Sequence, residues 1–166
     1  SRMDALNEMT ERIVEKDWKK TVLANNAIDL MNANARETFL LFHTTDRAPI
    51  MKRIAAHKDE ITKTLKTLDG MLYKAEGKAM LADITAKRKV YVDAFLKIPG
   101  LLESGREVEA SAMMSTEVVP ALQTLLASID KLIQFQGDLL DASAVEARNV
   151  YETSRKQMLA GLVAAI

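Results

Sequence analysis

One face of the segment 76–95 combines an arginine and a tyrosine in a pattern that could bind an anion. Its residues follow one another in steps of three and four, which places them on one side of a helix: Leu81, Ile84, Arg88, Tyr91, Phe95 and Ile98. Only Arg88 is charged. An unpaired cation in a protein interior is strongly unfavourable, so Arg88 either reaches water or meets an anion. A carboxylate would fit because the planar guanidinium donates two parallel hydrogen bonds to it.

Other expected inner faces also contain polar residues. His57 interrupts the apolar row from Ile54 to Leu72. Ser115, with Thr116 next to it, belongs to the row that begins at Ser111 and continues through Val118 and Leu122. If the helices pack side by side as a bundle, depth can be counted at about 1.5 Å per residue from the distal tip, the end opposite the chain termini. On this scale His57, Ser115 and Tyr91 lie roughly 14 to 16 Å from the tip and Arg88 roughly 21 Å. We therefore predict one polar layer that forms a ligand site, joined by Asn32 and Arg36 from the first helix.

Each of these residues also has a purely structural interpretation. A histidine on an apolar face is usually a core residue with one partner, and a core tyrosine usually finds one partner for its hydroxyl. Arg88 could pair with an acidic residue of a neighbouring helix. These alternatives stay open at the level of sequence.

The composition excludes several function classes. Lys plus Arg and Asp plus Glu both number 23, so the balanced charge gives no support for nucleic-acid binding. There is no cysteine, which excludes cysteine zinc sites, thiol nucleophiles and disulfides. The two histidines cannot build a three-histidine metal site, and no metalloprotease or di-iron motif is present. We predict no enzyme, no cofactor and no metal.

The rows of apolar residues predict an all-α fold without strands. Gly and Pro are few, at six and three, and helix-forming residues dominate. We expect a single domain, 1–166, with helices over 5–44, 48–74, 76–102 and 106–164, and local kinks at Pro99-Gly100 and Pro120. Short turns make this an antiparallel up-down-up-down four-helix bundle. Both termini then lie at one end, where the longer first and fourth helices protrude.

The expected first helix has two stripes. Its inner row is Ile28, Met31, Ala35, Thr38 and Phe42. A neighbouring stripe is mostly polar, and it is either a solvated face or a subunit contact. We predict a homodimer through this helix, with four residues at or near the contact: Asn32, Arg36, Phe39 and His43.

The last nine residues, 158–166, are almost wholly apolar. They are too few to span a bilayer, which takes about 20 residues. They are either an ordinary helix end or the first turns of a transmembrane helix that continues beyond this sequence. We favour the transmembrane helix because an ordinary end would expose a run of apolar side chains.

Three stretches together resemble a known family: EGKAMLADITAKRKVYVDAF (76–95), SGREVEASAMMSTEVVPAL (104–122) and the apolar C-terminal run. In this order and spacing, the chain resembles the four-helix-bundle ligand-binding domain of bacterial methyl-accepting chemotaxis proteins, the broad family of the aspartate and serine receptors. The resemblance implies a periplasmic sensor of an inner-membrane protein, flanked by two transmembrane helices and dimeric at least when ligand is bound. A chemotaxis receptor, a histidine kinase and a cyclase can all carry such a sensor.

The resemblance also bears on the ligand. In the aspartate-receptor branch, arginines of the first helix and a threonine early in the fourth hold the ligand. Arg36 matches the last of these arginines and Ser115 or Thr116 the threonine, but Ala27 and Asn32 stand at the earlier arginine positions. Other branches of the family bind organic or aromatic acids within one subunit, which suits an inward Arg88. Two arginines at nearby depths, Arg36 and Arg88, favour a ligand with more than one negative group, so we predict a small organic acid, a di- or tricarboxylate such as malate or citrate. Alternatives are an aromatic acid or amino acid, a histidine-kinase sensor of the same fold, or a structural dimerising bundle without ligand.

Overall fold

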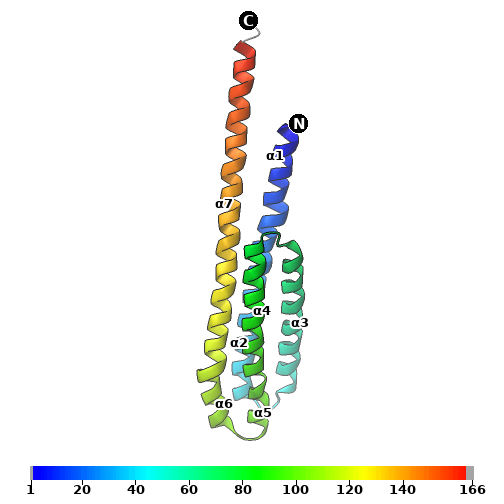
Figure 1. Ribbon diagram of the computed structural model, residues 1–166. Helices are drawn as coiled ribbons and strands as arrows, with labels where there is room; N and C mark the ends of the chain where they lie inside the picture. Colours follow the sequence, from blue (N-terminus) through cyan, green and yellow to red (C-terminus); the bar gives the residue numbers. More distant parts are fainter. Residues whose placement is uncertain (1, 164–166) are drawn as a thin grey trace.

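The computed structural model of the protein is a four-helix bundle, and it describes residues 2–163 (Figure 1). No β-strand occurs in that range. The first long helix is assembled from α1 (Arg2–Glu11), the π-helical η1 (Arg12–Asp17), α2 (Trp18–Leu40) and the 3₁₀ turn η2 (Leu41–His43). The second is α3 (Ala48–Met71), and the third is α4 (Ala75–Phe95) with α5 (Lys97–Glu103). The fourth consists of α6 (Glu107–Met113), the π-helical η3 (Met114–Val118) and α7 (Val119–Val163).

The long helices run alternately up and down, so both ends of the chain lie at the same end of the molecule (Figure 1). There α1 and α7 extend well beyond α3 and α4. With 45 residues, α7 alone is about 68 Å long at about 1.5 Å per residue. The predicted all-α up-down-up-down fold and the protruding first and fourth helices are confirmed.

Helix ends follow local chemistry. Pro49 lies in the first turn of α3, where its missing N–H costs nothing. The helix stops at Met71, three residues before the predicted end at 74, because Leu72 is already extended. The third helix breaks between α4 and α5 at Leu96. Pro99 explains that break because its ring would collide with the carbonyl four residues earlier, that of Phe95.

The core runs along the bundle axis, with α2 packed most closely on α3 and α4 on α7. The predicted apolar row of α3 is buried as expected, from Ile54 to Leu72. In the first helix the predicted inner row is rotated. Ile28, Ala35 and Phe42 are only half-buried, whereas the fully buried positions are Ala24, Ala27, Met31, Asn34, Thr38 and Leu41.

The fourth helix corrects a second predicted row. Ser111 and Ser115 were expected to face inward, but both are exposed, and Ala110 and Met114 take their place in the core. The physical reason is the π-helical turn η3, directly before Pro120. It holds more residues per turn, so the buried positions before Val118 are spaced by four and four instead of four and three.

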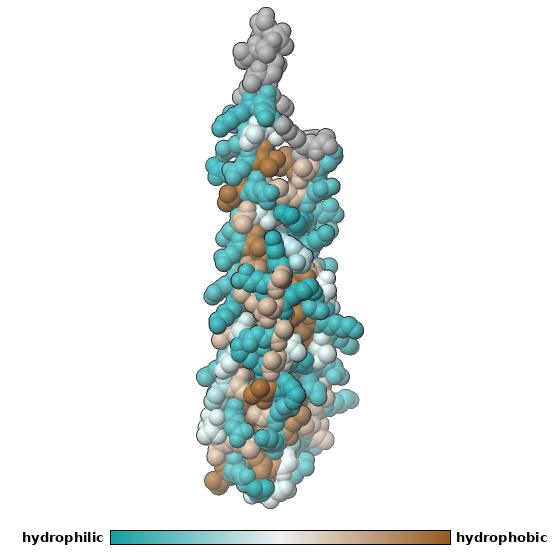
Figure 2. All heavy atoms as spheres, in the orientation of Figure 1, coloured by the Kyte–Doolittle hydropathy of each residue, from teal (hydrophilic) through white to brown (hydrophobic). Residues whose placement is uncertain are grey.

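One described helix, spanning Glu107–Gln157, is long and apolar enough to cross a membrane by length and composition alone. This is weak evidence, because a core helix passes the same test and Leu125, Ile129 and Leu132 of this helix are buried in the bundle. The predicted start of a transmembrane helix at 158–166 lies outside the side chains that the structure describes. The space-filling view shows a mixed surface in which apolar residues are scattered among polar ones (Figure 2).

Candidate functional site

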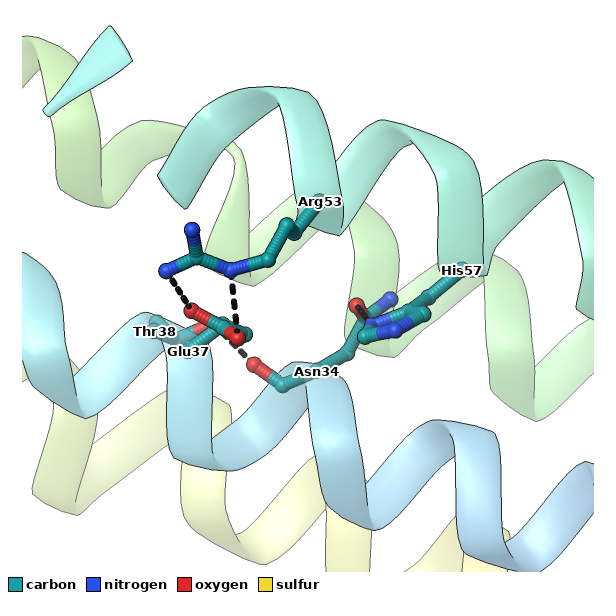
Figure 3. A network of polar contacts seen from close by, with 5 residues as sticks. All are labelled: Asn34, Glu37, Thr38, Arg53 and His57. Carbon is teal, nitrogen blue, oxygen red and sulfur yellow. Dashed lines mark hydrogen bonds and ion pairs between the residues drawn. The ribbon is translucent and has the colours of Figure 1, made fainter. Parts of the chain in front are cut away.

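A polar network joins α2 to α3 in the distal half of the bundle (Figure 3). Arg53 grips Glu37 with two parallel hydrogen bonds, Nε to Oε1 and Nη2 to Oε2, each 2.8 Å long. These bonds hold the pKa of Glu37 below its usual value and raise the pKa of Arg53. Both charges are thus satisfied within the subunit, on the rim of the helix pair.

His57 belongs to the same network. Its Nδ1 lies 3.0 Å from Oδ1 of Asn34, which is buried, and the hydroxyl of Thr38 donates to the Asn34 carbonyl oxygen at 2.8 Å. His57 is half-buried and has its partner inside the bundle. This arrangement matches the structural interpretation of a satisfied histidine. The sequence analysis did not single out Asn34, although its spacing from Met31 and Thr38 would have placed it on the buried face.

Arg88 has no carboxylate partner among the residues that the structure describes. Its Nη2 donates to the carbonyl oxygen of Lys58 at 2.8 Å and to the Thr62 hydroxyl at 2.9 Å, both on α3. Among the described residues it forms no ion pair, which excludes the interpretation that it serves an acidic neighbour in this subunit. Burial lowers the pKa of Arg88, because the half-buried guanidinium loses hydration without gaining a counter-ion.

A shallow groove surrounds Arg88 where α3 and α4 face each other. Its lining combines cations and hydroxyl groups with one apolar side chain: Lys58, Thr62, Thr85, Arg88, Lys89 and Val92. No acidic side chain of the described range lines it, although Lys89 pairs with Asp93 at 2.6 Å one turn further along α4. The groove therefore presents positive charge and hydrogen-bond donors, a combination that favours an anion.

Tyr91 lies one turn from Arg88 and is 3% exposed. Its ring packs on Phe95 with centroids 5.4 Å apart. Its hydroxyl is buried and has no hydrogen-bond partner among the described residues. Burial raises the pKa of Tyr91 to about 12. A buried hydroxyl without a partner is unusual and costs free energy.

The other predicted site residues are not gathered around Arg88. Arg36, Ser115 and Thr116 are exposed, and Asn32 is half-buried. The two hydroxyls bond within their own helix, Ser115 to the Ser111 carbonyl at 3.2 Å and Thr116 to that of Ala112 at 2.9 Å. The expectation that Ser115 faces the core is wrong, because the π-helical turn η3 shifts the buried positions to Ala110 and Met114. A ligand contact by these residues stays a prediction, and it would have to be made from outside the bundle.

The predicted contact stripe of the first helix does face outward. Arg36, Phe39 and His43 are exposed, and Phe39 is 50% exposed. The same spacing of three and four continues back to Val22 and to Trp18, which is 59% exposed. We call this row the outer stripe: Trp18, Val22, Asn25, Asp29, Asn32, Arg36, Phe39 and His43. Its exposed large apolar side chains are Trp18 and Val22 at the start and Phe39 near the end.

In the part of the chain that the structure describes, no group of three His, Asp or Glu residues is placed to hold a metal ion. A search of curated proteins gave no match. The family model described as a four helix bundle sensory module for signal transduction matches residues 1–151, nearly the whole chain. That match agrees with the four antiparallel helices found here. The chain belongs to the family of four-helix-bundle sensory modules for signal transduction.

Proposed function

We propose that this sensory module is the periplasmic domain of a membrane chemoreceptor and that it binds a small organic acid. Its family membership supports a sensor. The arrangement of α1 and α7 supports a membrane link, because both leave the bundle at one end and point the same way (Figure 1). A bound ligand would signal if it preferred one setting of these two helices over another.

The observation that carries the choice of an acid is Arg88. One nitrogen of its guanidinium, Nη2, donates to two neutral partners on α3, and the guanidinium contacts no carboxylate in the described chain. A ligand carboxylate in the α3–α4 groove would supply the missing negative charge. Lys58 lines the same groove and replaces Arg36 as the partner of a second carboxylate. Several cations in one groove favour a di- or tricarboxylate of the malate or citrate kind.

Tyr91 supports a ligand that reaches inward from the groove. Tyr91 follows Arg88 by one helical turn, and its buried hydroxyl lacks a partner among the described residues. A hydroxyl or carboxylate oxygen of the ligand would supply one. His57 contributes less to this proposal because Asn34 already satisfies it.

Calorimetry tests the proposal. Malate, citrate, an aromatic acid and amino acids are titrated into wild type, Arg88→Ala and the matched control Arg148→Ala, which removes an exposed arginine far from the groove. Arg88→Ala should weaken the best ligand by roughly 30-fold or more, because losing one partner of a buried charged contact costs about 2 to 5 kcal/mol. The control should bind like wild type. Equal binding by Arg88→Ala would exclude the groove, and no binding by wild type would favour the structural bundle.

We also propose that two copies associate through the outer stripe. Its exposed residues recur at the spacing of a coiled-coil contact, which suits an identical helix as partner. Asn32 and Arg36 stand in its middle, so a dimer would bring both copies of these polar side chains together. Bound ligand and membrane tethers would add to the association by raising the effective concentration of the two helices.

A further inference from the structure

The first long helix changes its winding where it enters the bundle. Residues Arg12–Asp17 are π-helical, between α-helical segments on both sides. Their sequence, RIVEKD, contains neither proline nor glycine, so no local breaker explains the irregular turn. A π turn accommodates one residue more than an α-helix of the same length, and such turns are frequent at functional sites. The cause must therefore lie in the tertiary contacts around this segment.

A buried ion pair lies at the end of the π-helical segment that enters the bundle. Asp17 and Lys20 are both 0% exposed, and Lys20 Nζ lies 2.6 Å from Asp17 Oδ1. The same ammonium lies 4.3 Å from the ring centroid of Tyr73, in the connection between α3 and α4. The ring face attracts the cation. This contact holds α2 in one rotational setting against the rest of the bundle.

On the N-terminal side of this ion pair, the first long helix makes weaker contacts with α7. A cleft separates α1 and η1 from α7, and its lining is mostly charged: Ala5, Glu8, Met9, Glu11, Arg12, Lys16 and Glu146. Arg12 lies 3.8 Å from Glu146 across this cleft, at the outer limit of an ion pair. The present winding also leaves two buried polar atoms without partners among the described residues, Arg12 Nε and Asp17 Oδ2. In the π-helical setting, the residues at both ends of the segment, Arg12 and Asp17, therefore each keep a buried polar atom without a hydrogen-bond partner among the described residues.

We infer that Arg12–Asp17 is a register switch between the bundle and the protruding segment α1. In one setting it is π-helical, as here; in the other it is α-helical, and the Asp17–Lys20–Tyr73 contact holds α2 in place in both. Passing from one to the other moves α1 by one residue. This rotates α1 by about 100° and shifts it by about 1.5 Å relative to α7.

The switch goes beyond the proposed function and does not depend on the identity of any ligand. It gives a small change inside the bundle a way to reach the end where α1 and α7 protrude together (Figure 1). A rotation of about 100° moves a Cα atom on a helix of radius about 2.3 Å by about 3.5 Å, and the end of a side chain by more. Regulation would consist of favouring one of the two windings.

Distance measurements between spin labels test the switch in the whole domain. One pair, Asn7→Cys on α1 with Asn149→Cys on α7, lies beyond the π segment; the other, Asn26→Cys with Asp130→Cys, lies within the bundle. All four residues are exposed. We expect two distances for the first pair and one for the second.

Deletion of Glu15 is the decisive variant. It removes the extra residue, so an α-helix can connect both flanks in their present setting, and the first pair should show a single distance. Glu15→Ala keeps the chain length and should retain both distances. A single distance in wild type, or a broad distribution that the deletion leaves unchanged, would overturn the inference.

Discussion

Arg88 on α4 reaches across to α3 and donates to the main-chain carbonyl oxygen of Lys58 at 2.8 Å. The positive charge thus meets a neutral oxygen where a carboxylate would be the stronger partner. That oxygen also accepts a bond from the Thr62 hydroxyl at 2.9 Å, so it does not depend on Arg88. The carbonyl oxygen of Lys58 therefore stays hydrogen-bonded when Arg88 is removed.

Replacing Arg88 by methionine should therefore leave the fold intact. Methionine keeps the apolar stem and removes a half-buried charge that has no counter-ion. We expect the free energy of unfolding to change by less than about 1 kcal/mol. Urea denaturation measures it. A loss of about 3 kcal/mol or more would show that Arg88 is a structural residue.

Tyr91→Phe should remove part of the pH dependence of stability at alkaline pH. The folded-state pKa of Tyr91 is raised from 10.0 to about 12, so between these values the unfolded chain loses the phenolic proton while the folded chain retains it. Stability contributed by this group is complete below pH 10 and is lost as the pH rises toward 12. In the phenylalanine variant this decline should be shallower, as denaturant midpoints between the two pH values would show. A matched variant is Tyr151→Phe, at an exposed tyrosine. Identical slopes in wild type and Tyr91→Phe would contradict the buried, unpartnered hydroxyl.

Phe39→Glu should weaken dimerisation. The change places a charge at a large apolar position of the outer stripe, and two copies would bring like charges together. Sedimentation velocity at high concentration with saturating acid should show a shift toward monomer. Val108→Glu changes an apolar side chain that is still more exposed than Phe39. It lies at the start of α6, outside the stripe, so this variant should leave the association unchanged. Equal association of wild type and Phe39→Glu would place the contact elsewhere.

Two glycine substitutions should have opposite effects on stability. Gly137 lies inside α7, and an added Cβ would meet no atom within 4 Å apart from the backbone of its own helix and its chain neighbours. Gly137→Ala should therefore stabilise by about 0.5–1 kcal/mol. Gly105 ends the turn before α6 with φ of +72°, which favours glycine, so Gly105→Ala should destabilise. Thermal unfolding of both variants measures the two signs. Stabilisation at Gly105 would contradict the turn geometry.

The sequence by itself determined the number of long helices, their unequal lengths and the common end of the two termini. These follow from the period of apolar residues and from the position of Pro99, which are local properties. It also identified Arg88 as a cation at the edge of the core, because one charged residue in an apolar row stands out without knowledge of its neighbours.

Only the tertiary structure decided which side chains meet. The π turn at Met114–Val118 changes the phase of the fourth helix, so an apolar row extended through it selects the wrong residues. One extra residue rotates the following helix by about 100°, which is enough to turn Ser115 outward and Met114 inward. Likewise, nothing local joins His57 to Asn34, 23 residues apart. Such partners depend on how two helices pack, and the apolar period specifies only the face each one buries.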